Sequence, residues 1–382
     1  MKQSYRVGVI GFAHMHVNEL ISKFGEHSQT KWVACADTVP RRPSLTDIPG
    51  SRRANLKRAL ESSGIPRSYD DYREMLDSED FDIMICCPEN TRHAEVAEAV
   101  ADRGIHVVLE KPIASTLPEA LQIVRAIRRN NVELLVNWPT TWRPWVMKVK
   151  ELIEGGEIGE VWQVKWRNGP SLGPLAFGST HPGDTVVTAV LEEKHKAAEW
   201  WYDANEGGGA LLDYCCYGAS LSFWYLGQKA VAAQALKANF FNEHGSADDN
   251  AVIVVRFANA LSILEGTWTT FHTGVPTGPI VYGTKGTIVV DGTLAKLYQQ
   301  RGASEPTRVY EGEPFPLGHR TVAETFIRHL EKGEPLHPTL DVEVNIAAMA
   351  ILDAGIRSAR SGKLEIIDDI VWSDPMCRET IR

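Results

Sequence analysis

The first 135 residues alternate between short apolar runs and segments whose apolar residues recur at helical spacing. Val17, Leu20, Ile21 and Phe24, for example, share one helical face between the first two apolar runs. Strands that alternate with helices are typical of βαβ units, so we predict a Rossmann-type, doubly wound parallel sheet over residues 1–137. Its strands are predicted at residues 6–10, 32–36, 81–87, 105–109 and 132–136, and its other helices at residues 91–103 and 116–129.

After residue 158 the pattern changes to strand-like runs that follow one another, with turn-forming residues at 257–261 and 282–286. We therefore predict a second domain, residues 138–382, with an open-faced, mostly antiparallel β-sheet and flanking helices. Residues 168–206 show no clear period, and a loop of that length is usually functional. The predicted strands are residues 161–166, 230–241, 251–257, 261–271 and 287–290, and the predicted helices are residues 208–226, 320–332 and 341–360, the last of which can pack back on the first domain.

The composition narrows the possible classes of function. The 40 basic and 49 acidic residues give a net charge of −9, which argues against a nucleic-acid-binding protein, because such proteins need a basic surface. No apolar run approaches the roughly 18 residues that span a membrane, and a strand from residue 5 leaves no room for a signal peptide, so we expect a cytoplasmic protein. The six cysteines contain no CxxC pair and are interpreted as buried free thiols.

The turn after the first predicted strand stands where a dinucleotide-binding fold carries GxGxxG. Only Gly11 keeps its place, while Ala13 and His16 replace the other two glycines, so an ordinary α/β turn without a nucleotide remains an alternative. Asp37 ends the second predicted strand, where a carboxylate bonds the ribose hydroxyls of NAD and repels a 2′-phosphate. Arg42 follows closely and favours a 2′-phosphate, which keeps NADP possible.

His14 and His16 also raise the question of a metal site. The two histidines are two residues apart and do not share a helical face, and no cysteine or carboxylate stands at ligand spacing in the sequence. We therefore expect no metal and interpret them as pocket-lining or helix-terminus residues.

A charged motif, Glu110-Lys111-Pro112, follows the predicted strand at 105–109. Ligands bind at the carboxyl ends of the strands in open α/β sheets, so Lys111 is a candidate site residue, with a surface ion pair as the alternative. Pro112 fixes the chain direction and is a candidate for a cis bond.

Four motifs together resemble the Gfo/Idh/MocA family of glucose–fructose oxidoreductase, inositol dehydrogenase and rhizopine-catabolism proteins. They are the Glu110-Lys111-Pro112 motif, residues 88–93, residues 153–160 and the glycine-rich run at residues 207–217. The resemblance extends over residues 5–360 and implies an NAD(P)-dependent oxidoreductase. The chain resembles a divergent branch of the family, because Ala13 and His16 replace two glycines and tyrosine stands at 217, where many members have histidine.

The resemblance also implies roles for individual residues. Lys111, Asp213 and Tyr217 are the implied catalytic group, and Trp138, His181 and Trp201 are candidate substrate contacts. NAD, with NADP as the alternative, is the implied cofactor. Its candidate contacts are Gly11, Phe12, Ala13, His14, Met15, Asp37, Arg42, Pro88, Asn90, His93, Glu110 and Lys111.

The three catalytic candidates have a chemical rationale. Asp213 and Tyr217 are four residues apart, so a helix places them one turn apart on one face. A tyrosine is too weak a base at neutral pH, and we expect the Lys111 ammonium to lower the pKa of Tyr217. The alternative is that Asp213 is an ordinary helix residue and Tyr217 part of the core.

We therefore predict a dehydrogenase that transfers a hydride between NAD(P) and a secondary alcohol or ketone of a sugar, cyclitol or related polyol. The alternatives are an NAD-dependent glycosidase that uses transient oxidation, and a non-catalytic NAD-binding sensor. The open sheet needs a covered face, so a homodimer or homotetramer is expected, and the expected partners include neither nucleic acid nor a membrane.

Overall fold

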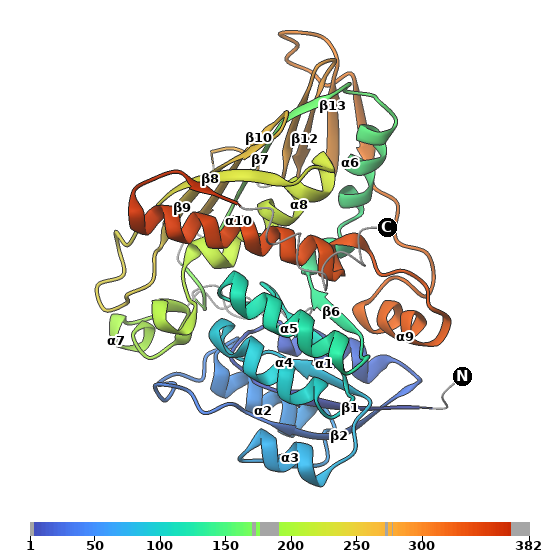
Figure 1. Cartoon of the computed structure of the whole chain (residues 1–382), viewed down its shortest axis with the longest axis vertical. Helices are drawn as coiled ribbons and strands as arrows, with labels where there is room; N and C mark the ends of the chain where they lie inside the picture. The colour runs from blue at the N-terminus through green and yellow to red at the C-terminus, as the bar shows by residue number, and fades with distance from the viewer. Residues whose placement is uncertain (1–3, 170–172, 176–190, 272–273, 277, 368–382) are drawn as a thin grey trace.

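The computed structural model describes residues 4–169, 173–175, 191–271, 274–276 and 278–367. Figure 1 shows two lobes, with the N-terminal half below and the large C-terminal sheet above. The predicted His181 and Cys377 lie outside the described residues. The other five cysteines are free and buried, as the sequence predicts. No described helix is both long and apolar enough to cross a membrane.

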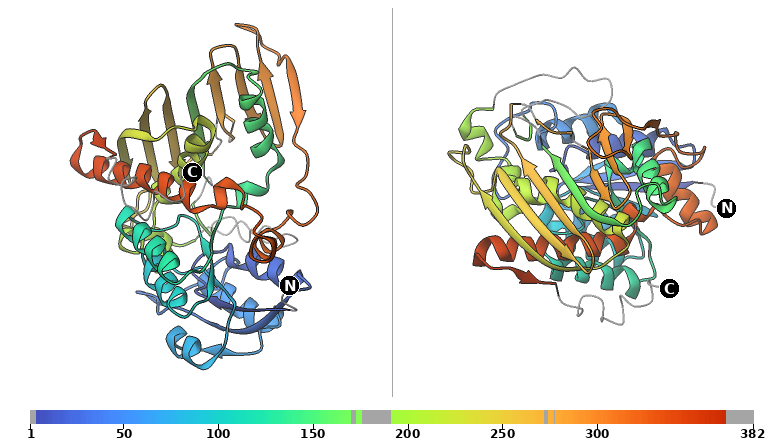
Figure 2. Two further views of the ribbon diagram at one scale, coloured as in Figure 1. Left: turned by 45° about the vertical axis from the view of Figure 1, so that its right-hand side comes forward. Right: turned by 90° about the horizontal axis from the view of Figure 1, so that it is seen from above.

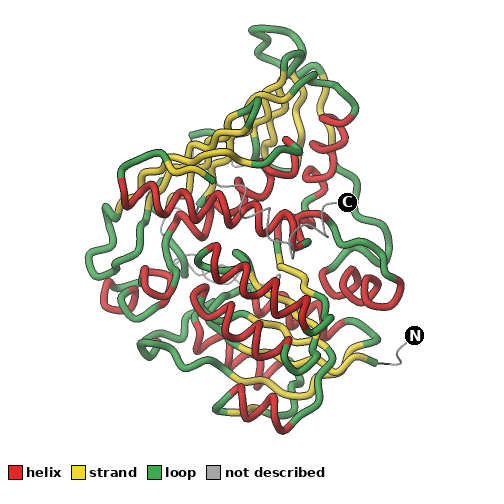
Figure 3. Tube along the Cα trace, viewed as in Figure 1, coloured by secondary structure: helices red, strands yellow, loops and turns green. Residues whose placement is uncertain are grey.

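The N-terminal lobe is a six-stranded parallel sheet in the order β3-β2-β1-β4-β5-β6, which confirms the predicted Rossmann topology. Its central strands are almost fully buried because helices cover both faces (Figure 3). The strands are β1 (Tyr5–Ile10), β2 (Thr30–Ala36), β3 (Ser68–Tyr69), β4 (Ile83–Cys86), β5 (His106–Glu110) and β6 (Leu134–Asn137). The helices are α1 (Val17–Glu26), α2 (Arg52–Ser62), α3 (Tyr72–Ser78), α4 (His93–Ala101) and α5 (Leu117–Arg129).

Two local features of this lobe show how the sequence sets its elements. A capping box is present at the start of α5, with Thr116 and Glu119 each bonding the other's backbone N–H. Helix α2 was not predicted, because its buried face consists of Arg52, Asn55 and Ala59 and carries no apolar stripe.

The C-terminal lobe is a nine-stranded sheet in the order β14-β13-β12-β11-β7-β10-β9-β8-β15. Only the β7–β10 pair is parallel among these strands, so the predicted mostly antiparallel sheet is confirmed. The strands are β7 (Val161–Asn168), β8 (Ala230–Ala238), β9 (Asn250–Phe257), β10 (Leu261–Thr267), β11 (Ile280–Gly283), β12 (Thr287–Asp291), β13 (Leu294–Tyr298), β14 (Arg308–Glu311) and β15 (Glu365–Ile366). The helices are α6 (Pro144–Glu154), α7 (Glu193–Lys196), α8 (Cys216–Leu226), α9 (Val322–Lys332) and α10 (Val342–Ser361).

Three predicted boundaries in this lobe differ from the structure. The strand predicted at 230–241 ends at Ala238, because the Asp249 carboxylate accepts the N–H groups of Phe240 and Phe241 and turns the chain. The strand predicted at 261–271 ends at Thr267. The helix predicted from residue 208 begins with a π-helical turn, Leu211–Cys215, before α8.

Helices α8 and α10 pack on one face of the large sheet and join the two lobes (Figure 2). Helix α10 contacts α5, and α9 contacts α1, so the last helices pack back on the first lobe as the sequence suggests. Trp138, directly after β6, donates its indole N–H to Asn345 Oδ1 of α10 over 2.6 Å. The carboxyl end of β6 therefore lies against α10.

Candidate active site

The ammonium of Lys111 lies just beyond β5 and is bound by Asp213 from the other lobe. Lys111 Nζ donates to Asp213 Oδ1 over 2.9 Å and to the Asp213 carbonyl over 3.1 Å. Lys111 is 2% exposed, and its bond to Pro112 is cis, as the motif suggests. Two of the three predicted catalytic residues therefore form a buried ion pair across the boundary between the lobes.

The backbone that carries Asp213 is fixed by Asp248, which the sequence analysis missed. Leu211 donates its N–H to Asp248 Oδ2 over 2.8 Å at the start of the π-helical turn. A Cβ at Gly209 would lie 2.5 Å from Asp248 Oδ1, and Gly209 has a φ of +120°, so the position requires glycine. The glycine-rich run thus lets Asp248 cap the turn that presents Asp213.

Electrostatics keep Lys111 in its charged form. Burial alone would lower the pKa of Lys111, because the ammonium loses water. The carboxylate of Asp213 outweighs that loss, and the pKa of Lys111 lies well above its ordinary value. Lys111 is therefore a cation and a hydrogen-bond donor at neutral pH.

Trp268 holds the second oxygen of the same carboxylate. Its indole N–H donates to Asp213 Oδ2 over 3.2 Å, and the ring is 3% exposed. Trp268 was not identified from the sequence as a site residue. Since Lys111 and Trp268 each donate to one oxygen, the carboxyl group of Asp213 is held in a fixed orientation.

Tyr217 lies next to Lys111, but its pKa is not lowered as the sequence analysis expects. Lys111 Nζ is 5.0 Å from the centre of the Tyr217 ring, so the ammonium faces the ring. The rings of Trp138 and Trp166 enclose Tyr217 at centroid distances of 5.1 and 5.8 Å. Burial raises the pKa of Tyr217 well above its ordinary value, although Lys111 opposes that rise. The expected lowering of the pKa is therefore wrong, and the phenol stays protonated.

The turn after β1 keeps one feature that a dinucleotide site requires. Gly11 has a φ of +86°, and a Cβ there would lie 2.5 Å from the backbone nitrogen of Pro88. Only glycine allows this approach of the turns after β1 and β4. Ala13, at the second glycine position, is 1% exposed, and its carbonyl accepts the indole N–H of Trp200 over 2.8 Å.

Asp37 presents one free oxygen at the end of β2. Its Oδ1 accepts the N–H groups of Phe12 and Thr38 over 3.0 and 2.9 Å and Arg52 Nη1 over 2.6 Å. No described residue donates to Oδ2, which fits a carboxylate that accepts ribose hydroxyls. Burial raises the pKa of Asp37, and Arg52 opposes that rise. The Gly11 turn and Asp37 thus fit the NAD that the family implies.

Arg52 was not identified from the sequence. Its guanidinium bridges the carboxylates of Asp37 and Glu89, and its side chain is only 7% exposed. Arg42, predicted as a cofactor contact, instead donates from Nη1 to the carbonyl of Ala197 over 2.6 Å. The cation closest to Asp37 is therefore already paired with two carboxylates.

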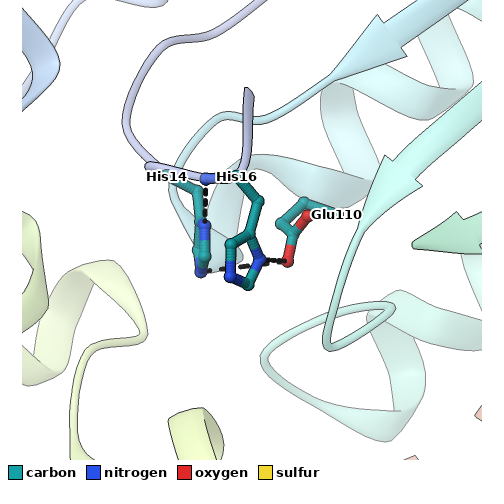
Figure 4. A group of neighbouring side chains, drawn as sticks. All are labelled: His14, His16 and Glu110. Atoms are coloured by element: carbon teal, nitrogen blue, oxygen red, sulfur yellow. Dashed lines mark hydrogen bonds and ion pairs between the residues drawn. The ribbon is translucent and has the colours of Figure 1, made fainter. Parts of the chain in front are cut away.

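His14, His16 and Glu110 meet at the boundary between the β1 turn and β5 (Figure 4). His16 Nδ1 lies 2.8 Å from Glu110 Oε1, and His14 Nε2 lies 3.8 Å from the same oxygen. No carboxylate stands at ligand spacing from these histidines in the sequence, but the fold brings Glu110 to them from 94 residues away. Their ligand atoms all lie within 4.8 Å of one another, which is close enough to consider a metal ion.

The hydrogen bonds argue against a metal at this cluster. His14 Nδ1 accepts the backbone N–H of His16 over 3.1 Å, so the proton of the neutral ring is on Nε2. That nitrogen then has no lone pair to offer, whereas a metal-bound histidine donates from its other nitrogen. Burial lowers the pKa of His14 well below its ordinary value, so the ring stays neutral. Glu110 is satisfied by His16 and by Asn137, which donates over 2.8 Å.

Two of the remaining predicted residues, Asn90 and Trp201, line a small cavity beside Lys111 and Asp213. Asn90 donates to the carbonyl of Gly207 over 2.8 Å, and the Trp201 ring lies 4.6 Å from the His14 ring. His93 is buried beside the carbonyl of Pro112 at 2.9 Å from its Nδ1. Trp138 reaches the site through Tyr217, and Met15 packs at the edge of the Trp200 cluster. The cavity is lined by His14, Asn90, Lys111, Pro112, Trp200, Trp201, Gly207, Gly208, Gly209 and Asp213.

Two family profiles match most of the chain. Residues 5–138 match the Gfo/Idh/MocA oxidoreductase family with an NAD-binding Rossmann fold, and residues 146–289 match the Gfo/Idh/MocA C-terminal domain. The first region contains the whole six-stranded sheet, and the second contains the strands of the large sheet from β7 to β11.

Individual proteins resemble the chain at low identity. YrbE of Bacillus subtilis, an uncharacterised oxidoreductase, is 26% identical over 253 residues, 65% of each chain. Myo-inositol 2-dehydrogenase of Thermotoga maritima is 24% identical over 333 residues, 84% of this chain and 90% of the relative. The structure of the WlbA dehydrogenase of Bordetella pertussis, solved with NADH and UDP-GlcNAcA, matches with a TM-score of 0.73 at 21% identity. The match covers 96% of this chain and 98% of the WlbA chain. At this identity the structural similarity establishes the fold alone.

Proposed function

The chain belongs to the Gfo/Idh/MocA family of NAD-binding oxidoreductases, and from this we propose that it oxidises or reduces a CH–OH group of a sugar, cyclitol or related polyol at the Lys111–Asp213 pair. The observation that supports the proposal is this buried pair at the carboxyl end of β5, where α/β enzymes bind their ligands. Myo-inositol dehydrogenase among the relatives supports the polyol class.

The residues that would hold NAD lie along the ends of β1, β2 and β4. Gly11 allows the close backbone approach, and Asp37 Oδ2 would accept the ribose hydroxyls. When bound, NAD supplies the site that gives or takes the hydride. A carboxylate at position 37 disfavours a 2′-phosphate, so NAD is the preferred cofactor.

Lys111 would bind and polarise the substrate oxygen. Two of its three N–H groups are used by Asp213, which leaves the third to donate to that oxygen. A cation held in a dry site stabilises the negative charge that develops when a ketone is reduced. Asp213 acts by keeping Lys111 charged and directed, and Trp268 acts by directing Asp213.

Tyr217 would contribute as a neutral phenol. Its hydroxyl keeps its proton at neutral pH because burial raises its pKa, so it serves as a donor and as a wall of the site. Trp138 and Trp166 fix its ring. This assignment replaces the phenolate base with a hydrogen-bond donor.

The experiment that tests the proposal is a substrate panel. Sugars, inositols and their keto forms are supplied with NAD or NADH, and the change in nicotinamide absorbance is followed. A polyol that yields NADH at steady state supports the proposal. Release of an aglycone without net production of NADH would indicate the glycosidase chemistry. If the protein binds NADH but turns over no member of the panel, the assigned enzyme activity is contradicted.

We also propose that the open face of the large sheet binds a second copy of the chain. Val254 and Leu261 on this sheet are 43% and 44% exposed, although strand residues of this type favour burial. Replacing both with lysine should convert an oligomer into a monomer in light scattering coupled to size-exclusion chromatography. A wild-type protein that is monomeric at micromolar concentration contradicts the proposal.

A further inference from the structure

A segment of the C-terminal lobe, Ala197 to Gly207, lies against the turn that follows β1. Trp200 donates its indole N–H to the carbonyl of Ala13 over 2.8 Å. The Trp200 and Trp201 rings lie 4.1 Å apart, and the Trp201 ring packs edge-on against His14 at 4.6 Å. Two indoles therefore cover the backbone of the turn at Ala13 and His14.

Polar contacts hold the two ends of this segment in place. At its start, Arg42 Nη1 donates to the carbonyl of Ala197 over 2.6 Å. Ser44 donates its hydroxyl to the carboxylate of Glu199. At its end, Asn90 donates to the carbonyl of Gly207 over 2.8 Å. The segment is thus bonded to three separate parts of the N-terminal lobe, the loop after β2, the turn after β1 and the turn after β4.

The contact buries the surface that a dinucleotide needs. Ala13 is 1% exposed, His14 is 2% exposed and Trp200 is 7% exposed. Ala13 stands at the position where the backbone of a dinucleotide-binding turn approaches the pyrophosphate. Since an indole already occupies that surface, the ring and a diphosphate cannot both be there.

We propose that residues Ala197–Gly207 form a strap that must leave the β1 turn before NAD binds, with Trp200 as the group that competes with the cofactor. The inference rests on the proposed function, because it takes NAD as the ligand of this turn. Gly207, with a φ of +77°, ends the strap, and Gly208 and Gly209 connect it to the turn that carries Asp213.

The strap has a defined thermodynamic consequence. If only the open form binds NAD, the measured dissociation constant equals the intrinsic constant divided by the open fraction. Loosening the strap then tightens NAD binding. A lid that closes over the cofactor, or a wall that stacks on it, predicts the opposite, because its loss removes contacts from the bound form.

The test compares NADH binding by titration calorimetry in the wild type, Trp200→Phe and Trp200→Ala. The Phe variant loses the bond to Ala13 and keeps most of the ring, whereas the Ala variant loses both. We expect affinity to rise in that order, by at least about tenfold for Trp200→Ala, since a buried tryptophan contributes several kcal/mol. Trp224→Ala, which removes an indole on α8 that packs against Tyr225 and His337, should change the affinity by less than about twofold.

Hydrogen exchange of the strap gives an independent measurement in the wild type. The amides of Tyr202 and Asp203 bond to carbonyls within the strap, so they report its order. NADH should increase their exchange if the strap is displaced. Ser44→Ala, a milder change that releases Glu199, should tighten NADH binding slightly and serves if Trp200→Ala does not fold.

The outcomes separate this inference from the proposed function. Tighter NADH binding by the Trp200 variants with faster exchange in the strap supports the inference. Weaker or unchanged binding, or slower exchange with NADH, overturns it and leaves the dehydrogenase proposal intact. If neither the wild type nor any variant binds NADH, the proposed function itself fails, and the strap loses its ligand.

Discussion

Lys111 and Asp213 are 102 residues apart in sequence, yet the lysine ammonium bonds both the carboxylate and the backbone carbonyl of the aspartate. Lys111 directly follows the parallel strand β5, and Asp213 lies in a π-helical turn of the opposite lobe. The pair therefore exists only when the two lobes are assembled. Its geometry makes the site sensitive to any change that moves one lobe relative to the other.

Removing the Lys111 side chain should abolish most turnover without removing the cofactor. Lys111→Ala loses the cation that polarises the substrate oxygen, and we expect kcat to fall by about 10² to 10⁴. NADH affinity should change by less than about threefold, since the contacts predicted at Gly11 and Asp37 remain. Steady-state kinetics and NADH fluorescence titration measure the two effects. Near-normal kcat in a folded variant would sink the assignment of Lys111.

Trp268 should behave as a positioning residue for Asp213. Trp268→Phe keeps an aromatic ring of smaller size and deletes one neutral N–H that donates to a carboxylate, so kcat should fall by about tenfold with a smaller change in KM. The aspartate then has one unpaired oxygen, and Lys111 is less firmly directed. Tyr202→Phe is the matched control, because Tyr202 packs against the same indole at 5.5 Å but does not bond Asp213. Equal losses in the two variants would show that Trp268 acts only through packing.

Asp37 should set the preference between the two nicotinamide cofactors. Asp37→Asn removes the negative charge and keeps an oxygen for Arg52, so NADH binding should weaken while NADPH binding strengthens. A hydrogen bond to a carboxylate is stronger than one to an amide oxygen by about 1 kcal/mol. We therefore expect the ratio of the NADH and NADPH dissociation constants to change by about tenfold. Fluorescence titration with each cofactor measures the ratio. A ratio that does not move would show that Asp37 serves only to pair Arg52.

The sequence predicted the architecture because both sheets carry strong hydrophobic patterns. The buried strands β1, β4 and β5 are short apolar runs, and the alternation with amphipathic helices such as α1 implies the parallel sheet. Lys111 and Asp213 were found because they lie in short motifs with recognisable neighbours. Such motifs depend on local spacing, which a single sequence displays directly.

The rest of the site depends on contacts that no local pattern encodes. Arg52 reads as a surface residue of a polar helix, and only the fold places it between Asp37 and Glu89. Glu110 reaches His16 from 94 residues away, and Trp268 reaches Asp213 from 55 residues away. The pKa of Tyr217 was predicted with the wrong sign, because the sequence shows the nearby cation but not the depth of burial.

His337 should make the protein less stable in acid. Burial lowers the pKa of His337 to about 4, while the unfolded chain keeps the ordinary value of about 6.5. Because the folded state has the lower pKa, the neutral ring stabilises the folded state fully above pH 6.5. This contribution to the free energy of unfolding, up to about 3 kcal/mol, is lost as the pH falls toward 4.

The variant His337→Asn tests this dependence without removing the local hydrogen bond. His337 Nδ1 accepts the N–H of Thr339 over 3.2 Å, and an asparagine oxygen can accept the same group but does not titrate. At pH 7.5 the wild type should be the more stable protein, because the ring also packs against Trp224 at 4.9 Å. At pH 4.5 urea unfolding should show the difference reduced or reversed. A difference that is the same at both pH values would mean that His337 does not titrate between the folded and unfolded states.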